Sequence, residues 1–398
     1  MAFFDPTRAA YRANPYPSLA RLRREDPVHW SPAVNAWILT RYDDCALVLR
    51  ESDCFTTDPS AGVGPRAEII GRHRASVPLG TAPTLGTSTG EQHRRLRHIV
   101  NPLFAPAQVE RLRPSIASRV EALLDTIPRD EPFDLIEAFA DPLPKQVMLE
   151  VMGIPPADAQ RVQRWFATIE LARTNPTVPP ALVAEARSAR AASVAFLRTY
   201  EEGGLRRDSV LATLLRASGA EAGLSPDEVV SLAVHIGMVG TGPSAGAIAN
   251  GLAALLEFPG ELAMLRNDPA HMPAAVHELF RYDSPTHAVP RIAVEDTILA
   301  GRRIRRGDVL LAMVGAANRD PAAFADPDRL DLARDARRHL GFGQGEHLCL
   351  GAPLARVIAE EALRSLLQRF DRLEVVGGLE YGPAFELRMP ERMIVRAA

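Results

Sequence analysis

The chain has 398 residues, of which 46% are apolar and 24% charged. These values are close to the average for soluble globular proteins and exclude fibrous and disordered classes. The formal net charge of −3 gives no basic footprint for nucleic acid or an anionic membrane surface. The stretch from Met1 to Pro6 is too short and polar for a signal peptide, and no run of about 18 apolar residues follows, so we expect no membrane span. The three cysteines are too few for a disulfide framework and favour a reducing, cytoplasmic compartment.

The first third of the chain is predicted to be mixed in secondary structure. Helical spacing of apolar residues covers 5–25, and two short strands, 28–30 and 36–40, are predicted to form a hairpin. A further helix is expected over 42–50. The stretch 52–89 is rich in Gly and Pro and has little periodicity, so it is predicted to be irregular; loops of this length are usually functional or disordered.

Helices dominate the middle of the chain. The pattern predicts them over 92–102, 106–127, 135–152, 156–173 and 182–202. The last two are joined by the proline-rich link 174–180, which cannot be helical. Ser225-Pro226-Asp227-Glu228 is typical of a helix start, with Ser as N-cap, Pro in the first turn and Glu closing a capping box. This central helix is predicted to run to about Phe258.

The last quarter combines short strands with one more helix. Strands are expected over 292–304 and 309–313, a helix over 352–370, and extended chain after it. We find no internal repeat, low-complexity segment or flexible linker. The fold class is therefore predicted to be mainly α with small β-sheets, in one domain covering residues 1–398.

The stretch most informative about chemistry runs from Phe342 to Gly351 and reads Phe-Gly-Gln-Gly-Glu-His-Leu-Cys-Leu-Gly. Its glycines allow tight turns and a close approach to a flat group. A helix is predicted to begin just after Cys349, and its unpaired N–H groups and dipole would stabilise a thiolate. A thiolate in such a loop suits a soft metal such as haem iron. For an isolated cysteine the alternative is a small buried hydrophobe.

The loop resembles the haem-binding loop of the cytochrome P-450 family, Phe-Gly-x-Gly-x-His-x-Cys-x-Gly, at every fixed position. Two further segments are similar to motifs of bacterial members. Glu278 to Arg281 resembles the Glu-x-x-Arg helix, and Phe324 to Arg329 the meander whose arginine, here Arg329, completes a Glu–Arg–Arg network. By spacing alone, Glu278 and Arg281 would be an ordinary ion pair within one helical turn, worth about 0.3–0.5 kcal/mol if exposed.

The resemblance implies a cytochrome P-450 fold that holds haem b between the long central helix and the cysteine loop with the last helix. Cys349 would be the axial thiolate ligand. The other haem contacts that the family pattern implies are Phe342, Gly343 and Gly351 in the loop, with His93, Arg97, Arg291 and His347 as partners of the propionates. Taken singly, these basic residues would be read as a solvated face, because of the 46 basic residues only Lys145 is not arginine.

The central helix departs from the family pattern at the proton-relay region, Thr241, Gly242, Pro243 and Ser244. The acid and the alcohol that normally deliver protons for O–O cleavage are replaced by Gly242 and Pro243. The hydroxyls of Thr241 and Ser244 lie in other directions around the helix. A kink or widened turn is expected at Pro243. The alternative is that one helix ends and another begins there, but the smooth helical pattern over 248–252 favours a continuous helix. Protons would come from Ser244, from a water on the freed Val239 carbonyl or from the substrate, or would not be needed.

The resemblance also implies which segments line a substrate pocket. They are 63–85, 165–180, 234–247, 287–289 and 384–385, with the link 174–180 as part of a lid. The first segment contains Arg66, Arg72, His73 and Arg74, which could bind a substrate carboxylate, although arginine is common throughout the chain. The sequence does not identify the substrate.

Three functions remain open. The first is oxidation of a bulky small molecule, in a natural-product tailoring step, with O2 and electrons from NAD(P)H through a ferredoxin and its reductase. An external electron source is expected because no Gly-x-Gly-x-x-Gly motif follows a strand. The second is haem-thiolate chemistry without ordinary oxygen activation: peroxide-driven oxidation, oxidative aryl coupling or rearrangement. The third is a haem-binding protein without turnover. In each case we expect a cytoplasmic monomer with no nucleic-acid or membrane partner.

Overall fold

The computed structural model describes residues 4–6, 8–174, 178–200, 208–218, 223–382 and 384–398. It divides into two compact units. Unit 1 comprises residues 1–55, 109–144 and 242–398, and unit 2 comprises residues 56–108 and 145–241. Each unit is described separately below.

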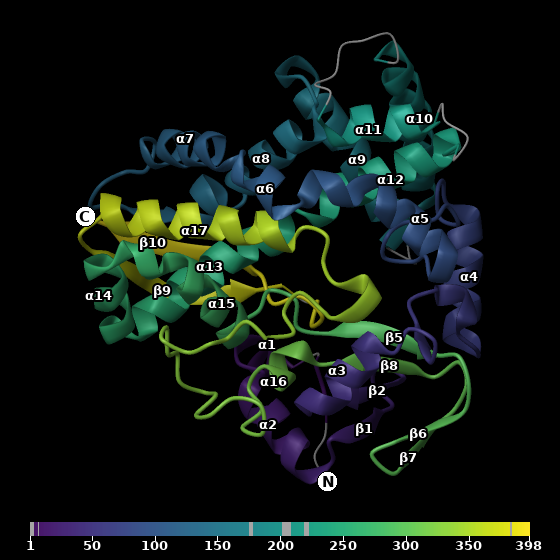
Figure 1. The fold of residues 1–398 in the computed structure, drawn as a ribbon, viewed down its shortest axis with the longest axis horizontal. Helices are drawn as coiled ribbons and strands as arrows, with labels where there is room; N and C mark the ends of the chain where they lie inside the picture. The colour runs from purple at the N-terminus through teal and green to yellow at the C-terminus, as the bar shows by residue number, and fades with distance from the viewer. Residues whose placement is uncertain (1–3, 7, 175–177, 201–207, 219–222, 383) are drawn as a thin grey trace. The chain divides into compact units, whose positions relative to one another are not determined.

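The longest helix described in unit 1 is α17. The helices of this unit are α1 (Ala9–Ala13), α2 (Tyr16–Glu25), α3 (Tyr42–Arg50), α7 (Arg113–Leu124), α13 (Gly242–Glu257), α14 (Pro259–Asn267), α15 (Met272–Tyr282), α16 (Val314–Ala317) and α17 (Ala352–Arg369). Helix α17 packs against α7, α13 and α15, as Figure 1 shows for α13 and α15. Gly251 permits the close approach of α13 to α17, since a Cβ there would lie 3.1 Å from Leu363.

Three small sheets complete unit 1. The largest has the strand order β1-β2-β8-β5-β3 and a parallel β2–β8 pair; the second has the order β4-β10-β9, and β6 and β7 form a hairpin. The strands are β1 (Val28–Ser31), β2 (Ala36–Leu39), β3 (Phe55–Thr56), β4 (Pro132–Asp134), β5 (Val289–Ala293), β6 (Thr297–Leu299), β7 (Arg302–Ile304), β8 (Val309–Ala312), β9 (Leu373–Tyr381) and β10 (Pro390–Ala397). The predicted β1–β2 hairpin is confirmed.

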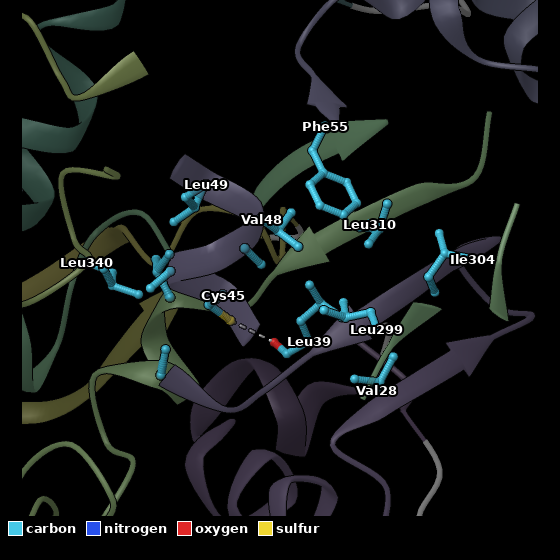
Figure 2. Close-up of a cluster of buried hydrophobic side chains, with 14 of the residues drawn as sticks. Val28, Leu39, Cys45, Val48, Leu49, Phe55, Leu299, Ile304, Leu310 and Leu340 are labelled. Atoms are coloured by element: carbon cyan, nitrogen blue, oxygen red, sulfur yellow. Dashed lines mark hydrogen bonds between the residues drawn. The ribbon is translucent and has the colours of Figure 1, made fainter. Parts of the chain in front are cut away.

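A buried apolar cluster joins the largest sheet to α3 (Figure 2). Val48 of α3 packs with Leu310 of β8 and Leu39 of β2, all fully or almost fully buried. Within this cluster the buried thiol of Cys45 donates to the carbonyl of Leu39 at 3.3 Å. Because it lies in an apolar core, Cys45 behaves as a small hydrophobe.

Unit 2 is helical. Its helices are α4 (Pro65–Ser76), α5 (Gly90–Val100), α9 (Ala159–Thr174), α10 (Pro180–Thr199), α11 (Val210–Ser218) and α12 (Pro226–Val239); α6 (Pro106–Glu110) and α8 (Pro142–Met152) lie at its boundaries. Helix α9 packs on α10 and α12. A Cβ at Gly237 would lie 3.1 Å from the Phe166 ring, so this glycine sets the α9–α12 distance.

Two predictions of local structure are wrong for identifiable reasons. The stretch 52–89, predicted to be irregular, contains α4, whose described residues are all at least partly exposed; a helix without a buried face leaves no apolar period in the sequence. The single helix predicted over 135–152 is a π-helical turn, Ile136–Ala140, followed by α8. Pro142 starts the second helix because the first turn needs no proline N–H.

The central helix differs most from its prediction. The capping box at its start is confirmed, because the Glu228 N–H donates to Ser225 Oγ and the Ser225 N–H donates to Glu228 Oε2 at 2.9 Å. The helix does not continue to Phe258: α12 ends at Val239 and α13 begins at Gly242. The kink or widened turn expected at Pro243 takes the form of a turn at Gly240 and Thr241, and Pro243 lies in the first turn of the new helix, where its missing N–H has no cost.

The stretch Pro226–Glu257 meets the length and composition of a membrane-crossing helix, with a mean hydropathy of 1.2 over its most apolar window. Of that window, 56% is buried inside the protein. The core helix of a folded protein has the same composition, because its surroundings are apolar on most sides.

Candidate functional site

Two left-handed glycines shape the loop that carries Cys349. Gly343 has φ 72° and Gly345 φ 74°, a region of backbone space that favours glycine. The loop is closed by three backbone hydrogen bonds, in which Gly343 donates to Leu340, Leu348 to Gly345 and Cys349 to Phe342, at 2.8, 3.1 and 2.9 Å. The position of Cys349 is therefore fixed by the main chain of its own loop.

The loop also touches the end of α3 at a point where no side chain fits. A Cβ at Gly345 would lie 2.9 Å from the Arg50 Cα and 3.0 Å from the Leu49 carbonyl oxygen. Contacts this short with backbone atoms cannot be relieved by a rotamer change. Gly345 is therefore required by both its φ angle and its packing.

The start of α17 lies beside the cysteine. Gly351 is the N-cap, and the helix begins at Ala352, as the sequence predicts. A Cβ at Gly351 would be 4.0 Å from Cys349 Sγ, and the Cys349 side chain is exposed. An accessible sulfur beside a helix N-terminus is in the electrostatic environment that favours a thiolate.

Behind the loop, Glu278 and Arg281 of α15 form a fully buried ion pair. Arg281 donates to both carboxylate oxygens of Glu278, at 2.6 and 2.8 Å, and to the carbonyls of Asn318 and Pro327 at 2.8 Å. A buried pair is tolerated only when its remaining hydrogen-bonding groups are satisfied in this way.

The prediction that the Arg329 side chain completes this network is wrong. Arg329 is exposed, and only its carbonyl takes part, accepting from Arg281 at 3.2 Å. The second arginine of the network is Arg334, whose Nε donates to Glu278 Oε1 at 3.2 Å. Both residues lie in the same irregular segment, so sequence spacing alone could not distinguish them.

A chain of hydrogen bonds connects the buried pair to the cysteine loop. Arg281 holds the carbonyl of Asn318, and the Asn318 side-chain oxygen accepts from the Leu340 N–H at 2.7 Å. Leu340 in turn accepts from Gly343. The Glu278–Arg281 pair thus positions the loop and takes no part in chemistry itself.

Arg291 on β5 is a buried cation with few hydrogen-bonding partners among the described residues. It is only 4% exposed, and its Nη1 donates to the carbonyl of Pro290 at 2.9 Å. Burial lowers the pKa of its guanidinium to about 10. No carboxylate among the described residues is recorded as its partner, so Arg291 fits a site that receives a negatively charged group from elsewhere, such as a propionate.

The other predicted propionate partners lie in different parts of the chain. His347 lies in unit 1, in the turn that precedes Cys349. His93 and Arg97 lie on one face of α5 in unit 2; His93 is buried, and the Arg97 Nε donates to the Asn101 side chain at 2.7 Å. Their roles toward haem remain predictions.

In the proton-relay region, one hydroxyl is bonded to the main chain and the other is buried. Thr241 donates its hydroxyl to the Met238 carbonyl at 2.9 Å, and Ser244 is buried at 6% exposure. A Cβ at Gly242 would lie 3.5 Å from the sulfur and terminal methyl of Met389, and one at Gly246 only 2.8 Å from Met389 Cγ. Met389 therefore covers the helix face where the family places its acid. Nothing in the sequence pattern indicates this contact.

His287, which is predicted to line the substrate pocket, does not do so. His287 is 1% exposed; its Nε2 lies 3.4 Å from the Tyr16 hydroxyl, and a Cβ at Gly315 would be 2.2 Å from it. Its ring is enclosed by protein, so the prediction that it lines a pocket is wrong. The predicted lid residues 175–177 and the Arg66 side chain lie outside the described residues.

Taken together, the fold and the site define a haem-thiolate class of protein: mainly helical, with an accessible cysteine in a glycine loop at a helix start. The residues fit haem by their own chemistry, since the loop offers a soft thiolate ligand and Arg291 is a buried cation with no carboxylate partner among the described residues. When bound, haem supplies the redox chemistry with oxygen.

Comparison with known proteins identifies the family. The model described as Cytochrome P450 matches residues 266–378. Polyketide biosynthesis cytochrome P450 PksS of Bacillus subtilis (strain 168) is 32% identical and aligns with 94% of this chain and 92% of that protein. The 6-deoxyerythronolide B hydroxylase of Saccharopolyspora erythraea is 33% identical, over 90% and 89%. The structure of epothilone D-bound cytochrome P450epoK superposes with a TM-score of 0.91 at 26% identity, covering 99% and 98%.

The chain belongs to the cytochrome P450 family and is an oxidoreductase of that type. The family implies a haem held by a cysteine thiolate. The sequence prediction of a mainly helical cytochrome P450 fold is confirmed.

Proposed function

We propose that this protein is a haem-thiolate monooxygenase that oxidises a bulky natural product. Cys349 would hold the haem iron as a thiolate, and electrons would arrive from NAD(P)H through a ferredoxin and its reductase. The observation that carries the proposal is the Cys349 loop, whose geometry leaves the sulfur accessible beside the start of α17. The named activities of the two curated relatives, in polyketide biosynthesis and in hydroxylation of 6-deoxyerythronolide B, support a bulky substrate.

Different residues of the chain shape the loop, support it from behind and would bind the propionates. Gly343, Gly345 and Gly351 let the loop approach a flat group, and Phe342 closes the loop through its carbonyl. The residues that would pair with the propionates of a bound haem are Arg291, His93, Arg97 and His347. The Glu278–Arg281–Arg334 network holds the loop from behind through Asn318. The net reaction consumes O2, two electrons and two protons for each oxygen atom inserted, and releases water.

A turnover screen tests the proposal. Candidate substrates are first selected by their effect on the haem absorption spectrum and are then incubated with NADPH plus ferredoxin and reductase, with hydrogen peroxide, or with neither. Oxygenated product that requires NADPH and the redox partners supports the proposal. Product with peroxide alone favours the second candidate below, and binding without product under any condition favours a non-catalytic haem protein.

A second candidate is oxidation driven by peroxide, with aryl coupling and rearrangement as other reactions that bypass the usual proton relay. The observation that favours it is the proton-relay region, where Gly242 and Pro243 carry no proton-transferring group and Thr241 is bonded to Met238. Hydrogen peroxide brings its oxygen atom together with two electrons and two protons, so the substrate C–H becomes C–OH and water is released without NADPH.

The double variant Gly242→Glu/Pro243→Thr separates the candidates, with Gly242→Ala/Pro243→Ala as its matched control. If the chain relies on another proton source or on peroxide, the double variant gains little in NADPH-driven turnover. A gain of about tenfold or more, equivalent to about 1.4 kcal/mol of barrier, with the same product and no gain in the control, would show that relay was the missing step. The second candidate would then be wrong.

A further inference from the structure

Unit 2 contains a cluster of polar side chains on three helices that the proposed chemistry does not use. The cluster comprises His73 and Arg74 of α4, Glu170 and Arg173 of α9, and Ser231 and His235 of α12; we call it the α4–α9–α12 cluster. Burying polar side chains costs free energy of folding unless the side chains are paired. Polar side chains that remain buried in this way are therefore candidates for a function.

Arg173 is the centre of the cluster. Its guanidinium lies 3.1 Å from Glu170 and donates to the Ser231 hydroxyl at 3.4 Å, while its main-chain carbonyl contacts His73 Nε2 at 3.1 Å. The Ser231 hydroxyl in turn donates to the Pro83 carbonyl at 3.1 Å. The side chains of Arg173 and Glu170 keep only 12% and 20% of their surface exposed, so the pair is poorly solvated yet still accessible.

His235 lies one helical turn after Ser231, on the same face of α12. Burial and the nearby Arg173 charge lower its pKa to about 4, so the imidazole is neutral at pH 7. Part of the residue remains exposed, and no described residue hydrogen-bonds to its ring nitrogens. The backbone at Gly86 is close, because a Cβ there would be 3.3 Å from the ring. A neutral ring with one donor and one acceptor is thus available to a ligand.

The charges of the cluster do not balance. Arg74 donates to the Gly80 carbonyl at 2.7 Å and lies near enough to Arg173 to lower its pKa further, in addition to the larger effect of burial. Glu170 is the carboxylate that pairs with Arg173, and burial raises its pKa. The two arginines and one carboxylate of the cluster leave a net positive charge, which favours an anionic ligand.

The same face of α12 becomes apolar one turn further on. Val239 follows His235 by four residues and is 48% exposed. A ligand with an anionic head and an apolar body matches this sequence of polar and apolar side chains along one helix face.

We propose that the α4–α9–α12 cluster selects substrates that carry a carboxylate, which pairs with Arg173 and accepts a hydrogen bond from a ring N–H of His235. The inference rests on the proposed function, because it names the class of molecule that the haem-thiolate enzyme oxidises. Glu170 competes with the substrate for Arg173 and keeps the empty site from holding an unpaired buried cation.

Decanoic acid and methyl decanoate test this assignment, since they differ in charge and share the same apolar body. Binding of each to the haem-loaded protein is measured by isothermal titration calorimetry at pH 7. The wild type is expected to bind the acid more tightly than the ester. Arg173→Gln should weaken binding of the acid about tenfold and leave the ester unchanged, Arg173→Lys should retain most of the acid binding, and His235→Phe should give a smaller, acid-selective loss.

Glu170→Gln provides the sharpest test, because the expected change has the opposite sign. Removing the competing carboxylate should tighten binding of the acid severalfold, which damage to the fold would not do. Arg164→Gln, an exposed arginine on the same helix, is the matched control and should change neither ligand. Equal affinity of the wild type for acid and ester, or equal losses for both in Arg173→Gln, would overturn the inference. The carbon-monoxide spectrum of the same samples tests the proposed haem-thiolate function separately, so the two failures are distinguishable.

Discussion

Two buried arginines of unit 1 show opposite ways of tolerating a charge without water. Arg281 is fully enclosed and is bonded to a carboxylate and to main-chain carbonyls. Arg291 is almost as deeply buried, and its recorded bond is to one neighbouring carbonyl. For Arg281, hydrogen bonds within the protein offset the cost of removing the charge from water. For Arg291, a ligand that supplies a carboxylate is expected to complete the site.

Replacing Arg291 by leucine is expected to weaken haem retention without destabilising the protein. The variant loses a charge-assisted bond to a propionate, so transfer of haem to apomyoglobin should be about tenfold faster. The free energy of unfolding of the haem-free form should be unchanged or about 1 kcal/mol higher, because an uncompensated buried charge is removed. Arg303→Leu, on the exposed β6–β7 hairpin, is the control. A loss of haem-free stability with normal haem retention would show that Arg291 has a structural role.

At the scale of elements, the main difference from the predicted secondary structure is that the central helix is interrupted between α12 and α13. Gly240 and Thr241 form a turn in which the Thr241 N–H and hydroxyl both bond to the Met238 carbonyl. Pro243 then starts α13. The interruption replaces a strained interior proline by one in the position that proline prefers.

The position of Pro243 can be tested by its effect on stability. An interior proline costs about 3 kcal/mol, so Pro243→Ala in a continuous helix would raise the free energy of unfolding by about that amount. In the first turn the change should be below about 1 kcal/mol. Chemical denaturation of the haem-loaded protein measures the difference, and Pro259→Ala, at the start of α14, should behave alike. A gain near 3 kcal/mol for Pro243→Ala alone would contradict the interruption.

The sequence predicts the elements with strong local signals and misses those that depend on packing. The capping box at Ser225, the hairpin of β1 and β2, and the start of α17 after Gly351 all follow from short patterns. Helix α4 has no buried face, and the choice of Arg334 over Arg329 depends on how an irregular segment folds around Glu278. The contact of Met389 with Gly242 joins residues far apart in the chain, so no local pattern could predict it.

At the scale of the whole molecule, the protein buries several histidines in their neutral form. Burial lowers the pKa of His287 and of His339 to about 3 and that of His235 to about 4. Each has an ordinary pKa near 6.5 in the unfolded chain. At pH values between the lowered pKa and the ordinary pKa, the unfolded state binds more protons than the folded state. The stability that the neutral histidines contribute is therefore present above about pH 6.5 and is lost as the pH falls.

His287 offers a direct test of this pH dependence. Its ring faces Tyr16, and Arg388 and Arg319 lie close enough to lower its pKa after the larger effect of burial. His287→Gln should reduce the slope of unfolding free energy against pH by about 1.4 kcal/mol per pH unit between pH 4 and 6. His29→Gln, on the partly exposed Asp26 pair, serves as the comparison. An unchanged slope in His287→Gln would mean that His287 is protonated in the folded protein.

The absorption spectrum of the reduced, carbon-monoxide-bound protein tests the central claim, that Cys349 holds the haem as a thiolate. The wild type should show the red-shifted Soret band of thiolate ligation. Cys349→Ala should lose that band, and Cys54→Ala, which changes a half-buried cysteine outside the loop, should keep it. A Cys349→Ala variant that retains the red-shifted band, or a wild type that binds haem without showing it, would contradict the account.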